Sequence, residues 1–401
     1  MQGKRIIQSL RLRDFLSFGS QTQDIELQPL NVLIGPNASG KSNMIEAFRI
    51  LNATPEDVGK PIREGGGISE YRWKGKSSTS GLEIGVNLSR QDGDCALAYS
   101  ITIADENSWI KVVKESIEPI FTEDTFPLIP EFFYRSLDQG HGVMYLKNVK
   151  THSDGESISY LPQEFPVSTT LSILSQRKDP TGLPALTYLQ DVFPSIHFYT
   201  GWDSARYGAL RYRQKADLPS TTLLEDGSNL GLVLINKPAS VRQQITERLK
   251  AVLPSVEEIF PKLEGGTVPL YIREKGFSTP IPATRLSEGT LRYLCLLTLL
   301  LDPTPPPIIC LEEPEAGLHP HVVSQIAELL IDASQRTQLI VTTHSDALIS
   351  GLTDCPEAII ICERDEDGTK LRRLEAEQIK PWLDRYAIGD LWRMGEIGGV
   401  R

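Results

Sequence analysis

The chain has 401 residues, of which 40% are hydrophobic and 23% are charged. This is the composition of an ordinary globular protein, so disorder is excluded as the main state, and the length predicts two or three sub-structures. Lysine and arginine number 41 against 52 aspartates and glutamates, and the net charge of −11 excludes a general nucleic-acid coat, although a local basic groove stays compatible with it.

Neither a membrane span nor a secretory signal is expected. The longest apolar run, Tyr293–Leu301, is far shorter than the roughly 20 residues that a membrane helix needs. Charged residues recur through the N-terminal segment where an apolar signal core would lie. The five cysteines are scattered, odd in number and without metal-ligand spacing, which favours a reduced, cytoplasmic setting.

In chain order, the first third of the sequence predicts mostly strands. Two strands are expected within 5–34, followed by an amphipathic helix over 41–52. The alternating apolar and polar residues of 82–119 predict antiparallel strands. Residues 120–180 are rich in Pro, Ser, Gly and Asp and form the least regular stretch.

In the rest of the chain, buried strands and helices alternate. Helices are expected over 182–193, 240–252, 288–301 and 320–333. Strands are expected over 196–200, 270–274, 308–311, 339–343 and 358–362. The two ends of the chain therefore show an α/β pattern, with a large insertion between them.

Residues 35–42 read Gly-Pro-Asn-Ala-Ser-Gly-Lys-Ser between an apolar strand and a helix, which is the context that the phosphate-loop motif requires. The glycines let backbone N–H groups turn toward phosphate oxygens, and the helix N-terminus adds about half a positive charge. Lys41 would reach the outer phosphates, and the Ser42 hydroxyl would ligate Mg²⁺. The residues expected to bind the nucleotide are Asn37, Ala38, Ser39, Gly40, Lys41 and Ser42.

A second segment carries two adjacent carboxylates, Glu312 and Glu313, after an apolar strand. The first would hold the Mg²⁺ shell, and the second would orient or deprotonate the attacking water. Acidic residues at the end of a strand are common, so on their own they are weak evidence for a nucleotide site. The functional interpretation depends on the phosphate loop that precedes them in the chain.

Two further segments each have a plain structural interpretation beside a functional one. In Leu286–Thr290, Ser287 is a good N-cap for the following apolar helix. The functional alternative is that this helix start faces the γ-phosphate of ATP bound by a second copy. His344 follows the strand 339–343 and is either a structural histidine or a γ-phosphate sensor.

Taken in this order, GPNASGKS, LSEGT, IICLEEPEAGLHP and VTTHS resemble the ABC-type ATPase heads of the RecF, SMC and OLD (overcoming lysogenization defect) group. The resemblance covers roughly 1–65 and 280–365. It implies an α/β fold, a P-loop NTPase of ABC-ATPase type with an antiparallel β subdomain and a helical insertion. The implied division is 1–119 for the N-terminal half of the head, 120–284 for an inserted irregular and helical region, and 285–401 for the C-terminal half and tail.

The resemblance also implies roles for individual residues. Glu312 takes the Mg²⁺ position, Glu313 is the catalytic base and His344 is the switch histidine. The signature residues Ser287, Glu288 and Gly289 act in trans, and 316–319 is the loop that touches the partner protomer.

Two weaker assignments follow from the same resemblance. Arg63, in a segment similar to one that supplies an arginine to the nucleotide in SMC proteins, would bind nucleotide, or it is a solvated loop arginine. Gln176 lies where a glutamine that senses Mg²⁺ and water is usual, or it is an ordinary surface glutamine.

The sequence departs from the group at Glu312, where aspartate is usual. The extra methylene moves the carboxylate by about 1.5 Å, so metal affinity or turnover is expected to be lower. The signature LSEGT also differs from the LSGGQ of transporters, which argues against a transporter ATPase subunit.

The resemblance implies a Mg²⁺-dependent ATPase, expected to be slow, that acts as a switch. Two heads would close around ATP as a homodimer and reopen after hydrolysis. OLD-like relatives carry a nuclease domain after the head, and the 57 residues beyond His344 are too few for one. We therefore expect a separate nuclease-like effector subunit in anti-phage defence or DNA maintenance. The alternatives are a RecF-like repair factor that acts directly on DNA and an ATP-binding assembly scaffold with little turnover.

Three further segments each have two possible interpretations. A cluster of Arg206, Arg211, Arg213 and Lys215 with interleaved tyrosines suits phosphate contacts along DNA, although a solvated face or a set of internal salt bridges is the commoner explanation of such a cluster. The Asp-x-Asp of 365–367 precedes glycine and predicts a hairpin turn rather than a nuclease centre. The tail 389–399 either docks a partner or folds onto its own core.

Overall fold

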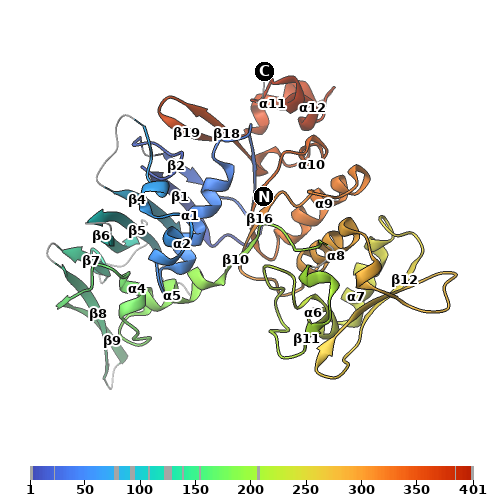
Figure 1. The fold of residues 1–401 in the computed structure, drawn as a ribbon. Helices are drawn as coiled ribbons and strands as arrows, with labels where there is room; N and C mark the ends of the chain where they lie inside the picture. Colours follow the sequence, from blue (N-terminus) through green and yellow to red (C-terminus); the bar gives the residue numbers. More distant parts are fainter. Residues whose placement is uncertain are drawn as a thin grey trace.

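The computed structural model describes residues 3–21, 23–75, 81–90, 95–106, 109–121, 129–137, 140–152, 155–205, 208–383 and 385–398. Within these residues, a central sheet lies between an antiparallel sheet on one side and a helical region on the other (Figure 1). This arrangement confirms the predicted α/β fold with an antiparallel β subdomain.

The central sheet has six strands in the order β10-β16-β17-β3-β18-β19. In that order they are Ile196–Tyr199, Ile308–Glu312, Gln338–Thr342, Leu30–Ile34, Ile359–Asp365 and Gly368–Arg373. All neighbours pair in parallel except β19, which returns antiparallel to β18 as the hairpin that Asp367-Gly368 predicts. The inner strands β16, β17 and β3 are apolar because both faces of the sheet are covered there.

The antiparallel sheet has eight strands in the order β2-β1-β4-β5-β6-β7-β8-β9. In that order they are Gln23–Glu26, Ile7–Arg13, Leu82–Leu88, Ala96–Glu106, Trp109–Ile120, Tyr134–Leu137, His141–His152 and Gly155–Pro166. The last three lie in the stretch expected to be least regular, so the sheet continues beyond residue 119. Their pattern is hard to recognise because glycine and proline, such as Gly142 and Pro162, occur inside strands β8 and β9, where few of the described side chains are buried.

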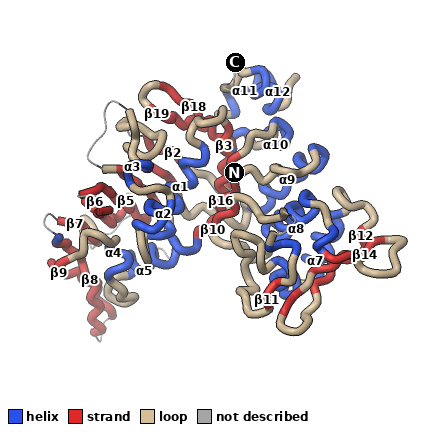
Figure 2. Tube along the Cα trace, viewed as in Figure 1, coloured by secondary structure: helices blue, strands red, loops and turns tan. Residues whose placement is uncertain are grey.

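Short helices connect the sheets, and longer ones cover the central strands. They are α1 (Lys41–Ala53), α2 (Gly59–Glu64), α3 (Ile68–Tyr71), α4 (Ile173–Gln176), α5 (Pro184–Val192), α6 (Leu230–Asn236), α7 (Ala239–Leu249), α8 (Glu288–Leu300), α9 (Pro320–Ala333), α10 (Asp346–Ser350), α11 (Ala376–Leu383) and α12 (Ile388–Met394). Smaller strands of the helical region are β11 (Gln214–Lys215), β13 (Thr267–Val268), β12 (Val256–Pro261), β14 (Leu270–Glu274) and β15 (Ile281–Pro282). Figure 2 shows α7 and α8 with the short strands β11, β12 and β14 on the side of the central sheet opposite the antiparallel strands, whereas α1 to α5 lie beside those strands.

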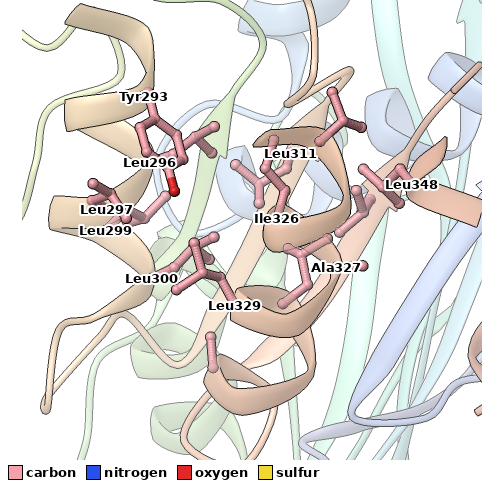
Figure 3. Packing of buried hydrophobic residues seen from close by; sticks show 14 of the residues in the cluster. Tyr293, Leu296, Leu297, Leu299, Leu300, Leu311, Ile326, Ala327, Leu329 and Leu348 are labelled. Carbon is pink, nitrogen blue, oxygen red and sulfur yellow. The ribbon is translucent and has the colours of Figure 1, made fainter. Parts of the chain in front are cut away.

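Alternate side chains of the central strands point to opposite faces of the sheet, where they belong to two different apolar cores. Ile309 and Leu311 of β16 point to the core built with α6, α7, α8 and α9, whereas Ile308 and Cys310 point to the core shared with α1, α5 and the antiparallel sheet. Helix α8 is buried along nearly its whole length, because it lies between the other helices and the sheet (Figure 3). The sheet is therefore fixed from both sides.

The C-terminal tail packs on the chain itself. Helix α12 contacts α10, and Ile388 and Leu391 of α12 are buried. Gly389 allows the close approach, since a Cβ there would lie 2.2 Å from the carbonyl oxygen of Asp346. Among the described residues, every helix is too short or too polar to cross a bilayer.

A buried ion pair ties the helical region to α8. The ammonium of Lys237, which follows α6, contacts the carboxylate of Asp302, which follows α8, and both side chains are more than 90% buried. Removing one partner of such a pair leaves the other charge buried without a counter-ion.

We expect Asp302→Ala to lower the free energy of unfolding by roughly 3–5 kcal/mol, because the Lys237 ammonium stays buried without its carboxylate. Glu328→Ala, which removes the partner of Arg248 in an exposed pair, is the matched control and should cost about 1 kcal/mol or less. Urea unfolding of both variants measures the difference. Equal losses would contradict the structural role given to the buried pair.

Candidate functional site

The phosphate loop connects β3 to α1 in a conformation that depends on glycine. Gly40 has φ 103° and Ala38 has φ 63°, so the loop turns through the left-handed region twice. A Cβ on Gly40 would lie 2.4 Å from Thr369 Oγ1 and 2.5 Å from Ser17 Oγ, which excludes any side chain there. No side chain caps the N-terminus of α1, so its first backbone N–H groups face the loop, as an anion site requires.

Lys41 is held against its own loop. Its Nζ donates to the carbonyl oxygens of Gly35 (2.8 Å) and Pro36 (2.9 Å), and the residue is only 6% exposed. Burial lowers the pKa of Lys41, and the nearby Cys362 and Glu313 partly oppose that shift. A partly desolvated ammonium beside open N–H groups is a strong attraction for phosphate oxygens.

The acidic pair lies at the carboxyl end of β16, between β10 and β17. Glu312 is paired in register with Thr342, and the Glu313 N–H donates to the Thr342 carbonyl (3.0 Å). Glu313 has φ 44°, which is strained for a residue with a Cβ and turns the chain sharply out of the strand. The Glu313 Oε1 comes within 3.6 Å of His344 Nε2.

His344 is fixed by its backbone as well as by Glu313. Its N–H donates to Glu315 Oε1 (3.1 Å), which also accepts the hydroxyl hydrogen of Thr343. The pKa of His344 is lowered from its ordinary value of 6.5, first by burial and then by Lys41, while Glu313 and Glu315 oppose the shift. The imidazole is therefore neutral at pH 7, with one N–H to donate.

One cavity of about 270 Å³ joins the end of the phosphate loop to the acidic pair. Its lining comprises Ser42, Tyr199, Thr200, Gly201, Trp202, Arg292, Leu311, Glu312, Glu313, Pro314 and Ala316. A hydroxyl and a carboxylate that face the same cavity are a donor set that suits Mg²⁺. Among the described residues no cluster of three or more His, Cys, Asp or Glu could hold a metal alone.

Sequence reasoning missed the part of this lining that comes from β10 and α8. Thr200, Gly201 and Trp202 follow β10, whose residues pair with those of β16, so the two strands end at the same edge. Arg292 reaches the cavity from α8 and donates to the Ala316 carbonyl (3.2 Å) and to Ser204 Oγ (3.0 Å). The sequence predicts a strand at 196–200, but it does not show that this strand pairs with β16 in the sheet.

The signature segment caps α8 and packs against the loop after the acidic pair. The Oγ of Ser287 accepts from the Thr290 N–H (3.0 Å), as the N-cap interpretation predicts. Glu288 accepts from Ser204 Oγ (3.0 Å) and pairs with Arg292 (3.1 Å). A Cβ on Gly289 would lie 2.9 Å from the Gly317 carbonyl oxygen. Its action in trans stays a prediction.

Arg63 and Gln176 have partners outside this cavity. Arg63 is part of α2, pairs with Asp57 and is 56% exposed. The Gln176 amide accepts from the Ser168 N–H (2.7 Å) and donates to the Leu171 carbonyl (2.9 Å), within its own loop.

The four basic residues predicted as a DNA contact, Arg206, Arg211, Arg213 and Lys215, do not share one environment. Arg206 lies outside the described residues. Arg211 donates to the carbonyls of Leu286 (2.6 Å) and Ser204 (2.8 Å), so it supports the approach to the signature segment. Arg213 is 3.8 Å from Glu264, and Lys215 is exposed on β11.

The charges around His344 predict how its pKa responds to substitution. Lys41→Met should raise the pKa of His344, and Glu313→Gln should lower it further, because the two charges act in opposite directions. NMR titration of the imidazole measures both shifts. Because the pKa is lower in the folded than in the unfolded chain, this group destabilises the fold as the pH falls below about 6.5. Shifts of the opposite sign would contradict this placement of Lys41 and Glu313.

Comparison with known proteins identifies the fold and the family. A family model described as "AAA domain, putative AbiEii toxin, Type IV TA system" matches residues 30–350. The Old nuclease of Escherichia phage P2 is 26% identical over 147 residues, which is 34% of this chain and 24% of the phage protein, so the match spans about a quarter of that relative.

Solved structures show the same fold at low identity. An Smc head bound to the C-winged helix domain of ScpA has a TM-score of 0.56 at 17% identity, with 93% of this chain and 99% of that chain covered. An Smc head with an extended coiled coil, bound to the C-terminal domain of ScpA from Pyrococcus furiosus, has a TM-score of 0.52 at 15% identity, with 94% and 98% covered. The chain therefore belongs to the AAA-domain family and is an ABC-type ATPase head of the SMC and OLD-like group.

Proposed function

We propose that this ATPase is a Mg²⁺-dependent switch that closes head-to-head with a second copy on ATP and controls a separate, nuclease-like effector in DNA maintenance or anti-phage defence. The observation that carries the proposal is the single cavity onto which Ser42, Glu312 and Glu313 open, with Lys41 and His344 placed around it.

Each residue has a role that its position supports. Lys41 would leave the loop carbonyls to contact the outer phosphates. Ser42 and Glu312 would hold Mg²⁺, which supplies charge neutralisation at the phosphates when it is bound. Glu313, turned out of β16, would orient the attacking water and accept its proton. Neutral His344 would donate to the γ-phosphate and release that contact after hydrolysis.

Pairing with a second copy accounts for the position of the signature segment. Within the described residues, the cavity lining includes Arg292 of α8 but not Ser287 of the same chain, and Ser287 is exposed. The start of α8 is therefore available to another copy, where its positive end would face a γ-phosphate. Without ATP, two phosphate-binding surfaces would face each other, which disfavours closure.

The nuclease-like effector is inferred from a relative of this chain. The relative from phage P2 is called a nuclease, and the region it shares with this chain is about a quarter of its length. We propose that a separate subunit supplies the nuclease-like activity here. Cys295, Cys310, Cys355 and Cys362 are reduced thiols, and we propose a reducing, cytoplasmic setting for the protein. DNA contact through Arg213 and Lys215 stays part of the proposal.

A second candidate is an ATP-dependent assembly scaffold with little turnover. One observation favours it: glutamate stands at the Mg²⁺ position, Glu312. A phosphate-release assay with and without DNA separates this candidate from the switch, because a scaffold would bind ATP and assemble without releasing phosphate.

We expect Glu313→Gln to bind ATP, to lose phosphate release by about 10²–10⁴-fold and to accumulate as an ATP-bound dimer, because the base is lost and the contacts to ATP stay. Size-exclusion chromatography with light scattering, together with the phosphate-release assay, measures both effects. Lys41→Ala should not bind ATP and should stay monomeric.

Glu247→Gln, on the exposed surface of α7, is the matched control and should behave as the native chain does. A Glu313→Gln protein that stays monomeric with ATP and hydrolyses it normally would remove Glu313 from the site.

A further inference from the structure

Three carboxylates stand at the end of β16 or just after it: Glu312, Glu313 and Glu315. The first two have roles in the proposed mechanism, whereas Glu315 has none. Yet Glu315 is bound to the switch segment, residues 343–345, because its Oε1 accepts from the His344 N–H (3.1 Å) and from the Thr343 hydroxyl. It therefore joins the ends of two neighbouring parallel strands, β16 and β17.

The loop that carries Glu315 is itself fixed. The Ala316 N–H donates to the Glu313 carbonyl (2.8 Å), and the Leu318 N–H donates to the Glu315 carbonyl (3.0 Å). The Ala316 carbonyl in turn accepts from Arg292 of α8 (3.2 Å). The carboxylate of Glu315 thus projects from an anchored backbone and can serve as a stationary acceptor.

The imidazole of His344 is not fixed by contacts of its own ring. Its Nε2 lies 3.6 Å from Glu313 Oε1, which is beyond hydrogen-bond distance, and its side chain is 38% exposed. The position of the ring therefore depends on the backbone from which it projects.

That backbone is held by local bonds on both sides of His344 and by Glu315 at His344 itself. The Thr343 N–H donates to the Leu33 carbonyl of β3 (3.1 Å), and the Ser345 N–H donates to Thr343 Oγ1 (3.0 Å). The Thr343 hydroxyl gives its own hydrogen to Glu315. One carboxylate oxygen therefore orients both the hydroxyl that Ser345 contacts and the N–H of His344.

The second oxygen of Glu315 indicates that the carboxylate serves function more than stability. Oε2 is buried, and it finds no hydrogen-bond donor among the described residues. A buried carboxylate oxygen without a donor is costly, and an apolar side chain of similar size would avoid that cost. What the carboxylate supplies in return is the pair of hydrogen bonds at Oε1.

We propose that Glu315 is a positioning residue for His344. Its carboxylate fixes the backbone of the switch segment, so that the imidazole stands beside Glu313 and faces the place of the γ-phosphate. This rests on the proposed function, because it takes His344 as the group that contacts the γ-phosphate. Glu315 itself contacts neither substrate nor metal, so its removal should change turnover and leave nucleotide binding unchanged.

The test measures phosphate release from ATP by the full chain with Mg²⁺. Glu315→Ala should lower kcat by about 10- to 100-fold, because the imidazole loses its fixed position, and should leave the KM for ATP within about twofold. Glu315→Gln should recover most of the native kcat, because an amide oxygen can accept both hydrogen bonds. Glu328→Ala, on the exposed surface of α9, is the matched control and should behave as the native chain does.

A double-mutant cycle shows whether Glu315 acts through His344. His344→Ala should lower kcat by itself, and Glu315→Ala added to it should cost less than about twofold more, because no imidazole remains to be positioned. NMR titration gives a readout that needs no turnover. Glu313→Gln should lower the pKa of His344 in the native chain, and this effect should be lost in the Glu315→Ala chain, where the imidazole no longer lies beside Glu313.

Three results would overturn the positioning role while the proposed function stands. Glu315→Ala could lower kcat by the same factor with and without His344, it could raise the KM for ATP as much as it lowers kcat, or Glu315→Gln could be as impaired as Glu315→Ala. A fully active His344→Ala chain would remove His344 from the proposed function and the positioning role with it. If the native chain releases no phosphate, the proposed function fails, and the NMR comparison decides the positioning role by itself.

Discussion

Parallel pairing of β16, β17 and β3 is the constraint on which this molecule depends. Parallel strands end at the same edge of a sheet, so residues far apart in the chain meet there. Leu311 of β16 is paired with Val341 of β17, which is paired with Val32 of β3. That register brings the loop before Lys41, the turn at Glu313 and His344 together across some 300 residues of sequence. The two apolar cores, one on each face of the sheet, keep the strands in this register.

Two features of the site, the burial of the Lys41 ammonium and the backbone strain at Glu313, are unfavourable unless a nucleotide is bound. Lys41 is buried on carbonyl groups, which depresses its pKa, and Glu313 occupies a strained backbone conformation opposite a neutral His344. A partly desolvated ammonium such as that of Lys41 is costly on its own and gains most from a ligand that carries the opposite charge. Triphosphate and Mg²⁺ together offer both signs. The start of α8 lies outside the cavity of its own chain, and pairing with a second copy would add the charge that is still missing.

The local parts of the site could be predicted from the sequence, and the long-range parts could not. The phosphate loop, the acidic strand end and the N-cap at Ser287 are set by neighbouring residues, so their pattern is readable along the chain. Strands β7–β9 lack a clean alternation and were expected to be irregular. The lining from Thr200 depends on which strand pairs with β16, and that neighbour cannot be read from the local sequence. Gln176 fits a family position by sequence, yet its amide is used within its own loop.

The central claim is that two copies complete one ATP site, with Lys41 from one and Ser287 from the other. Mixing a Lys41→Ala protein with a Ser287→Arg protein tests it most directly, because only a mixed dimer combines an intact phosphate loop with an intact signature. Each variant alone should release no phosphate above background, and an equal mixture should regain about a quarter of the native rate if the two sites act independently. A Ser287→Arg protein that is fully active by itself, so that its site needs no serine from a neighbour, would contradict the account.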